Sequence, residues 1–422
     1  MGAGGEDGGG AMSAPAGPME SSTRDVRTAA RTESAVPRAL RRYLCLEDFE
    51  PVARKRLPRQ IYGYYAGAAE TGAAFRASRE AYERLALMPR VLVDTRGRTT
   101  TRALFGTSYS LPVGIAPMGL SGLSTFQGDL VLAQAARAEQ ALMVASATSL
   151  IGLERLASEG GARWFQTYLP GEPERIEAML ARVVAAGYET LVLTADVPVP
   201  ANRENNVRTG FSIPLKPSVR LLLDGMRHAP WSLKTFGRTL LGGMPRFENM
   251  DVFRGPAILS RTVERAVGAR DGLAWSHLAL MRRLWKGKLV IKGILAPDDV
   301  ALARAAGVDG VWISNHGGRQ LDTAIAPLTV LREAVAQAGE MAVMIDGGIR
   351  RGTDVLKALA LGADFVFVGR PFLFAAAAAG PDGVRHALLL LQMEIARDMA
   401  MLGIDRLDAL GPHFVRPADA RP

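Results

Sequence analysis

The sequence has 422 residues, 48% of them hydrophobic and 22% charged, which is the composition of a globular protein with enough length for a large core. Its net charge is +9, but only 6% of its residues are aromatic and no nucleic-acid-binding motif is present, so the charge favours an anionic substrate or membrane surface over a nucleic acid. The single cysteine, Cys45, excludes an intrachain disulfide, and the five scattered histidines lack metal-ligand spacing, which argues against a metal enzyme.

The first part of the chain contains a tail and a helical segment. Residues 1–38 are rich in small and polar residues without apolar periodicity, which predicts a disordered tail. The pattern becomes helical from Leu44, and Tyr64 and Tyr65 lie there in an aromatic cluster. Such a cluster is usually core, although a tyrosine keeps a polar tip that can face a cavity. No apolar run reaches the ~18 to 20 residues of a membrane span and no signal segment is seen, so we expect a cytoplasmic protein.

Short apolar strands alternate with amphipathic helices from residue 111 onward. Strand and helix alternating eight times predict a (β/α)₈ TIM barrel of class α/β, in which the active site lies where the strands end. A doubly wound open sheet is the alternative, but no Gly-x-Gly-x-x-Gly follows the first strand. The predicted strands cover 112–117, 141–146, 164–168, 190–196, 289–293, 310–315, 342–347 and 365–369.

Polar residues and glycines recur at the ends of these strands. Ser146 or Gln166, taken alone, would be read as a satisfied buried polar group. A purely structural barrel gives no reason for the regularity, so the whole set predicts a site at the barrel mouth. The set comprises Pro117, Met118, Gly119, Ser146, Gln166, Tyr168, Thr194, Asp196, Lys292, His316, Arg319, Asp346, Gly347, Gly348, Gly369 and Arg370.

The alternation is interrupted between the fourth and fifth strands, from about residue 198 to 286. This insert is far longer than an ordinary βα connection needs. Its first half interleaves leucines, Trp231 and Phe236 with lysines and arginines. The mixture suits the surface of an anionic bilayer, and a solvated lid packed on the barrel fits it equally well.

His316 and Arg319 follow the sixth strand within a glycine-containing turn. The imidazole titrates near neutrality and can accept a proton, while the guanidinium can hold a carboxylate through two parallel hydrogen bonds. Asp196 can orient His316 and stabilise its imidazolium. Together these residues suit an acidic substrate that must lose a proton.

Residues 346–354 lead from the seventh strand into a helix. The glycines let backbone N–H groups approach an anion, the helix N-terminus favours negative charge, and Arg350 and Arg370 add cations. This pattern predicts a phosphate site. Lys292 ends an apolar strand and needs an anionic partner when buried. That partner is either a reduced flavin ring or a carboxylate such as Asp196.

These motifs resemble the FMN-dependent 2-hydroxy acid dehydrogenase and oxidase family. The resemblance runs from about residue 44 to about residue 410, and its most specific segment is Ser314-Asn-His316-Gly-Gly-Arg319-Gln-Leu-Asp322. The other motifs occur in the family's order and spacing. They are Tyr64-Tyr65, Gln166-x-Tyr168, Thr194-Ala-Asp196, Lys292-Gly293, Asp346-Gly-Gly-Ile-Arg-Arg and Gly369-Arg370-Pro371.

The resemblance implies a role for each site residue. His316 would be the base and Asp196 its partner, and Tyr168 would bind the oxygen that becomes the keto group. Tyr64, Arg203 and Arg319 would hold the substrate carboxylate. The FMN-binding set would be Pro117, Met118, Gly119, Ser146, Gln166, Thr194, Lys292, Ser314, Asp346, Gly348, Arg350, Gly369 and Arg370.

The implied reaction is the oxidation of an (S)-2-hydroxy acid, similar to lactate or mandelate, to the 2-keto acid. Reduced FMN would pass the electrons to a quinone or another membrane carrier. Segments 117–122, 224–233 and 243–245 most resemble the membrane-associated dehydrogenases of the family, as does Gly119, where the oxidases usually carry alanine. Asn205-Asn206 and the tail depart from the family pattern. The resemblance further implies a homotetramer, peripheral on the inner face of the cell membrane.

Three other functions fit parts of the sequence. An oxidase would pass the electrons to dioxygen and produce hydrogen peroxide. A second alternative is a different flavin-containing barrel enzyme, such as an isomerase or a nucleotide dehydrogenase, although its reaction would not require both His316 and Arg319. A catalytically silent anion-binding or membrane-surface protein would purify without yellow colour. The sequence leaves open which acid is oxidised and whether the α-hydrogen leaves as hydride or as proton.

Overall fold

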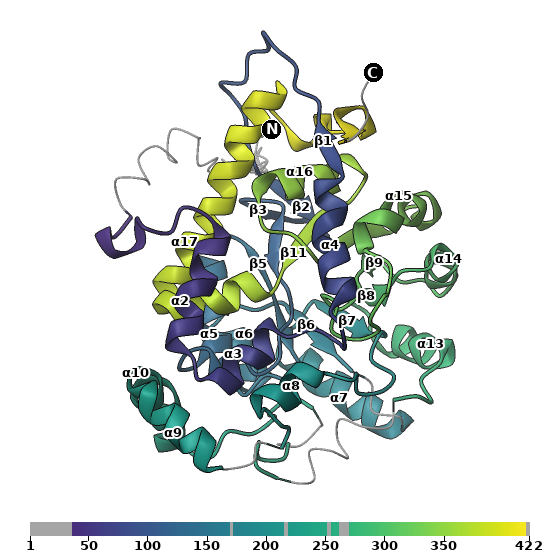
Figure 1. Cartoon of the computed structure of the whole chain (residues 1–422). Coiled ribbons are helices and arrows are strands. Elements are labelled where there is room, and N and C mark those ends of the chain that lie inside the picture. The colour runs from purple at the N-terminus through teal and green to yellow at the C-terminus, as the bar shows by residue number, and fades with distance from the viewer. Residues whose placement is uncertain (1–35, 169–171, 215–217, 251–254, 261–269, 419–422) are drawn as a thin grey trace, which may run out of the picture.

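The structure, a computed structural model, describes residues 36–168, 172–214, 218–250, 255–260 and 270–418 (Figure 1). Most of the predicted tail, 1–38, lies outside the described residues, and its last residue begins the short helix η1 (Arg38–Leu40). The helices that follow precede the barrel in the chain. They are η2 (Leu46–Asp48), α2 (Phe49–Arg56), α3 (Arg59–Ala66) and α4 (Ala73–Glu83).

Eight parallel strands close into a barrel in the order β10-β11-β4-β5-β6-β7-β8-β9. The predicted TIM barrel and all eight of its strands are therefore confirmed, and the doubly wound open sheet is excluded. Most strands are one to three residues shorter than predicted because the chain turns into the loops of the barrel mouth. The strands are β4 (Val113–Ile115), β5 (Leu142–Ser146), β6 (Trp164–Thr167), β7 (Thr190–Thr194), β8 (Lys288–Ile294), β9 (Gly310–Ile313), β10 (Ala342–Asp346) and β11 (Phe365–Val368).

Large side chains fill the barrel interior. Trp312 stacks on Phe367 with 3.8 Å between ring centroids, and both side chains are fully buried. This stacked pair fills the middle of the barrel, as side chains do in a TIM barrel. The helices of the outer ring are α5 (Gly128–Ala138), α6 (Leu153–Ser158), α7 (Pro173–Ala185), α14 (Pro297–Ala305), α15 (Pro327–Ala338), α16 (Gly352–Ala360) and α17 (Arg370–Leu402).

The long helix α17 joins the barrel to the N-terminal helices, and it lies beside α2 in Figure 1. It contains a kink at Ala379 and Gly380, just before Pro381. Its His386 bonds through Nε2 to the Tyr43 carbonyl at 2.9 Å. Two small antiparallel sheets and three 3₁₀ helices complete the fold outside the insert. They are β1 (Leu85–Leu87) with β12 (Val415–Pro417), β2 (Arg102–Leu104) with β3 (Thr107–Tyr109), and η3 (Ser121–Leu123), η5 (Leu407–Ala409) and η6 (Pro412–Phe414).

The described part of the insert between β7 and β8 combines short helices with non-helical segments, and it is anchored on the barrel. The indole Nε1 of Trp231 donates to the Leu123 carbonyl at 2.8 Å, and Arg238 lies 4.2 Å from the ring centre of Phe126. In Figure 1, α9 and α10 lie at the periphery of the molecule. The described elements of the insert are α8 (Glu204–Thr209), α9 (Val219–Arg227), α10 (Ala229–Trp231), the π-helix η4 (Ser232–Gly237), α11 (Arg238–Leu241) and α13 (Trp275–Leu284).

The outer face of α9 is apolar. Leu222 is 65% exposed and Met226 is 58% exposed, and Leu223 is exposed beside them. None of the described helices combines the length and apolar composition needed to cross a bilayer.

Candidate active site

A cavity opens at the carboxyl ends of the barrel strands, and its empty space together with the solvent at its open mouth measures about 1410 Å³. Every predicted site residue lines this cavity except Asp196 and Ser314. These two lie behind the wall and bond to residues that form it. In the described ranges, no three His, Cys, Asp or Glu side chains lie close enough to hold a metal ion.

His316 and Asp196 form a hydrogen-bonded pair at the cavity wall. The Nδ1 atom of His316 lies 3.0 Å from Oδ1 of Asp196. Burial lowers the pKa of His316 and outweighs the opposite effect of the neighbouring carboxylate, so the imidazole is neutral at pH 7. Burial alone would raise the pKa of Asp196, but His316 and Lys292 together lower it, so Asp196 is ionised. Nδ1–H then donates to Asp196, and Nε2 keeps a lone pair that can accept a proton.

The turn that carries His316 is held by α4. His316 has a φ of +56°, and Gly318 has a φ of +70°. A Cβ atom on Gly318 would lie 2.5 Å from the Phe75 backbone nitrogen, so only glycine fits at this approach to α4. Asn315 bonds the turn to the same helix, because its Nδ2 donates to the Ser78 hydroxyl at 2.9 Å.

Lys292 is 4% exposed and forms an ion pair with Asp346, with 3.1 Å between Nζ and Oδ2. Nζ also donates to the Ser314 hydroxyl at 2.7 Å, and that hydroxyl donates to Asp346 at 2.6 Å. Of the carboxylates that the sequence left open as a partner, the structure therefore selects Asp346 and not Asp196. An ammonium has three N–H donors, so one remains for a ligand in the cavity.

Arg350 and Arg370 lie at the end of the cavity formed by the loops after β10 and β11. Arg350 donates to the Ile349 carbonyl at 2.8 Å, and Arg370 donates to backbone carbonyls such as that of Gly67 at 2.9 Å. Neither guanidinium pairs with a carboxylate in the described parts of the chain. Burial lowers the pKa of both groups. Two cations without counter-ions make this end of the cavity suitable for an anion such as phosphate.

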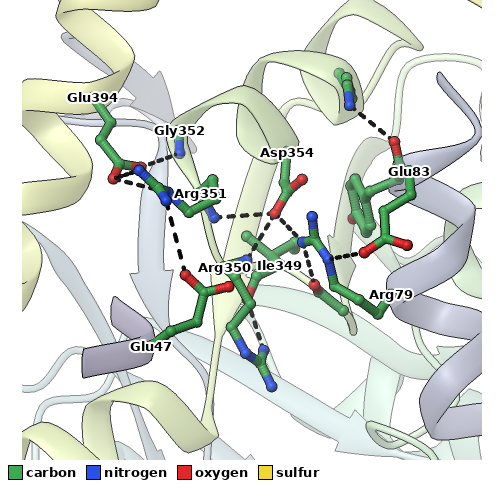
Figure 2. Close-up of polar contacts among 12 residues, drawn as sticks. Glu47, Arg79, Glu83, Ile349, Arg350, Arg351, Gly352, Asp354 and Glu394 are labelled. Carbon is green, nitrogen blue, oxygen red and sulfur yellow. Dashed lines mark hydrogen bonds and ion pairs between the residues drawn. The ribbon is translucent and has the colours of Figure 1, made fainter. Parts of the chain in front are cut away.

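The N-terminus of α16 differs from the expectation of an open anion site. The Asp354 carboxylate accepts the backbone N–H groups of Arg350 and Arg351 at 2.9 and 3.0 Å, and Glu394 accepts that of Gly352 at 2.7 Å. Figure 2 shows these contacts together with the ion pair between Asp354 and Arg79 of α4. The chain's own carboxylates therefore cap this helix, and an anion in the cavity depends on the arginines and glycines instead.

Gly348 shows why the loop after β10 needs glycine. It has a φ of +82°, and a Cβ atom would lie 2.1 Å from the Ser78 carbonyl oxygen of α4. The sequence predicted glycine here because it lets an anion approach the backbone. The structure adds a second reason, which is that the loop packs closely against the backbone of α4.

Arg319 and Arg203 form a second group of cations, beside Tyr64. The Arg319 Nη1 donates to the Gly67 carbonyl at 2.8 Å, and its guanidinium lies 5.0 Å from the Tyr64 ring centre. The Arg203 Nε donates to the Arg319 carbonyl at 3.2 Å. Burial and the charge of Arg203 lower the pKa of Arg319 to about 10, so Arg319 is a cation at pH 7. Among described residues neither pairs with a carboxylate, as expected of a site for an acid.

Several lining residues were not predicted. Phe367 and Leu373 belong to the predicted eighth strand and the segment after it, and Thr148 follows the second strand, so a strand-end search with wider limits would have found them. A lid from the insert was expected to line the pocket, but no periodic pattern in its sequence indicated which of its residues would do so. The unpredicted lining residues that bear on the site are Tyr65, Thr148, Val197, Ile213, Phe247, Arg270, Phe367 and Leu373.

Comparisons with known proteins place the sequence in a family and find similar proteins over most of its length. The sequence matches the FMN-dependent dehydrogenase family over residues 53–417. It is 38% identical over 375 residues to (S)-mandelate dehydrogenase of Pseudomonas putida, covering 88% of this chain and 93% of that protein. It is 35% identical over 376 residues to L-lactate oxidase of Nostoc sp., covering 88% and 97%. The crystal structure of monotopic membrane protein (S)-mandelate dehydrogenase gives a TM-score of 0.83 at 36% identity, covering 89% of this chain and 99% of that chain.

Proposed function

Because the chain belongs to the FMN-dependent dehydrogenase family and is an oxidoreductase acting on CH–OH groups, we propose that it oxidises an (S)-2-hydroxy acid, similar to lactate or mandelate, to the 2-keto acid. The observation that carries this proposal is one cavity lined by His316, whose imidazole is bonded to Asp196 behind the wall, and by Arg203 and Arg319, which pair with no carboxylate among the described residues. A neutral base and a carboxylate clamp are what the oxidation of a hydroxy acid requires.

Several hydrogen-bond donors in the cavity lack partners among the described residues, and FMN could supply acceptors for them. Gln166 has a buried Nε2 without a hydrogen bond among the described residues, Lys292 has a spare N–H, and Arg350 lacks a carboxylate. A flavin ring edge and a phosphate supply matching acceptors. FMN, when bound, accepts the two electrons that leave the substrate. We propose that Pro117, Met118, Gly119, Ser146, Gln166, Thr194, Lys292, Gly348, Arg350, Gly369 and Arg370 hold it, with Ser314 and Asp346 positioning Lys292.

The substrate residues act through charge and proton transfer. Arg319 and Arg203, beside Tyr64, hold the carboxylate of the acid. The hydroxyl of Tyr168 donates to the oxygen that becomes the keto group, and burial raises the pKa of Tyr168 to about 12, so it keeps its proton. The Nε2 atom of His316 accepts the proton that the substrate loses, and Asp196 stabilises the imidazolium that results.

We propose a quinone or another membrane carrier as the electron acceptor, and a peripheral position on the inner face of the cell membrane. The support is the exposed apolar face of α9 beside the basic residues Arg227 and Lys234. The similar (S)-mandelate dehydrogenase of known structure is a monotopic membrane protein, which agrees with this proposal. The proposed homotetramer rests on family likeness alone.

The test of the reaction is anaerobic stopped-flow mixing of the yellow protein with (S)-mandelate and, separately, with L-lactate. Loss of the oxidised flavin absorbance with either acid supports the proposal. A protein that stays colourless when FMN is supplied, or keeps its flavin oxidised with every 2-hydroxy acid tried, contradicts it.

The acceptor needs a separate test, because a relative is an L-lactate oxidase. We expect reduced enzyme to be reoxidised anaerobically by a soluble quinone, with little hydrogen peroxide formed in air. Rapid peroxide formation and no reaction with quinone would assign the oxidase function instead.

A further inference from the structure

Arg270 is a buried cation that the proposed reaction does not use. It is 8% exposed and lines the cavity, at the end of the insert. Within the described parts of the chain its guanidinium has no hydrogen bond or ion pair. Its contact is with the Tyr168 ring, whose centre lies 4.0 Å from the guanidinium carbon. Burial lowers its pKa, which expresses the cost of keeping this charge away from water.

The stacking on Tyr168 does not balance that cost. A cation over an aromatic face gains less than a charge loses on burial without a counter-ion. A guanidinium also carries five N–H donors in one plane. Stacking on a ring face gives these in-plane donors no acceptor, whereas a carboxylate can accept from them. Arg270 is therefore poised for an anion that enters the cavity.

That anion is not the FMN phosphate. Tyr168 follows β6, and in the closed order of strands β6 lies four places from β10. In an eight-stranded ring this is the opposite side of the barrel from the loop that carries Arg350. Arg270 and the proposed phosphate site therefore lie on opposite sides of the cavity.

That anion is also distinct from the substrate's own 2-hydroxy carboxylate. Arg203 and Arg319 already supply two cations to that group, and they are joined by the hydrogen bond between the Arg203 Nε and the Arg319 carbonyl. No hydrogen bond joins Arg270 to either residue in the described parts of the chain, and Arg270 lines the cavity together with Ile213 and Phe247, two apolar residues that also come from the insert.

We propose that Arg270 binds a second anionic group at the far end of the substrate's side chain, so that the preferred substrate is a 2-hydroxydicarboxylate. The proposal rests on the proposed function, and it narrows the substrate class. The second carboxylate takes no part in the oxidation, in which the CH–OH group loses two electrons and two protons. It adds affinity and selects among acids.

The experiment compares acids of the same shape and different charge. We expect kcat/KM for (S)-2-hydroxyglutarate or (S)-malate to exceed that for the matching ω-amide by about 10- to 100-fold, the effect of one charge-assisted hydrogen-bonded pair. Arg270→Met should remove this preference, and Arg270→Lys should keep part of it. Arg283→Met, which removes an exposed arginine of α13, is the matched control and should leave the preference intact.

A binding measurement gives the same comparison without turnover. The dissociation constants of 2-oxoglutarate and of its ω-amide, followed by the change in the flavin spectrum, should show the same preference and the same loss in Arg270→Met. The visible spectrum and the melting temperature of each variant check that it is folded and holds FMN.

Each other outcome has a definite meaning. If monoanionic acids reduce the flavin and the dicarboxylates are no better in wild type, the inference is wrong and the proposed function stands. If Arg270→Met alters only the reoxidation of the flavin by quinone, Arg270 belongs to the acceptor and the inference is again wrong. If no 2-hydroxy acid reduces the flavin, the proposed function itself fails.

Discussion

The barrel and the insert form two walls of one cavity, and the two walls are held in different ways. On the barrel side, His316 is paired with Asp196, and Lys292 is paired with Asp346. On the insert side, Ile213 and Phe247 are apolar and Arg270 has no polar partner among the described residues. On the barrel wall, His316 and Lys292 therefore have carboxylate partners before a substrate arrives, whereas Arg270 of the insert wall has none among the described residues. The barrel wall supplies the base, and we expect the insert wall to influence which acid binds.

Removing the base on the barrel wall should have the largest effect on catalysis. We expect His316→Ala to slow flavin reduction by about 1000-fold, because general-base catalysis typically contributes about 100- to 10,000-fold. FMN should stay bound, since His316 is not in the proposed cofactor-binding set. Anaerobic stopped-flow measures the rate, and the visible spectrum measures the FMN content. Full activity in this variant would refute the assigned base.

Arg319→Met tests whether the carboxylate clamp and the cofactor site are separate. The dissociation constant of the keto-acid product should rise about 100-fold, because a carboxylate loses a bidentate partner in a buried site. FMN affinity should change little. Arg350→Met is the matched control, with the opposite expectation of weakened FMN binding and a nearly unchanged clamp. Equal losses of acid and FMN in both variants would contradict the division.

The outer surface of the insert can be changed without touching the cavity. We expect the triple change of Leu222, Leu223 and Met226 to serine to weaken binding to anionic vesicles by about 30-fold, because apolar area that would enter the bilayer is lost. Flavin reduction should be unchanged. Val184→Ser, at an exposed position of α7, is the control. Unaltered vesicle binding in the triple variant would remove the support for the membrane proposal.

A deletion of 212–250 is a poorer test of membrane binding. It would remove Trp231, whose indole donates to the Leu123 carbonyl, and Phe247, which lines the cavity. Loss of these two side chains would disturb the active site as well as the outer surface.

The smallest effect concerns the pH dependence of kcat/KM. Because burial lowers the pKa of His316, its neutral form persists below pH 6.5, and the acidic limb of the profile should lie below that value. Asp196 raises that pKa, so Asp196→Ala should move the limb to still lower pH and reduce kcat by about tenfold. A limb that moves to higher pH in this variant would contradict the assigned pair.

The barrel and its strand-end residues could be predicted because parallel strands are apolar on both faces and all end at the same rim. The partner of Lys292 could not. Asp196 follows the neighbouring strand β7 and was the nearer candidate, yet the ion pair crosses to Asp346 on β10, two strands away on the other side. Which side chains meet inside a barrel depends on the curvature of the barrel, and this curvature cannot be read from the sequence.

Of two other features, one had a signal in the sequence and the other did not. Asp354 lies three residues after Arg351, which is the spacing of a capping residue, so the closed N-terminus of α16 had a readable signal that the phosphate interpretation passed over. Arg270 had no signal at all. Its place beside Tyr168 is set by how the insert folds back over the barrel.

Helix α4 carries contacts that determine when during synthesis the site can form. Ser78 bonds to Asn315, which lies 237 residues later, and Arg79 pairs with Asp354, which lies 275 residues later. A ribosome releases α4 long before β9 and β10, so these contacts cannot form until the later segments have been synthesised. The turn after β9, which carries His316, and the loop after β10, which carries Gly348, both depend on these contacts with α4. We therefore expect FMN to be loaded only after β9, β10 and the start of α16 have left the ribosome.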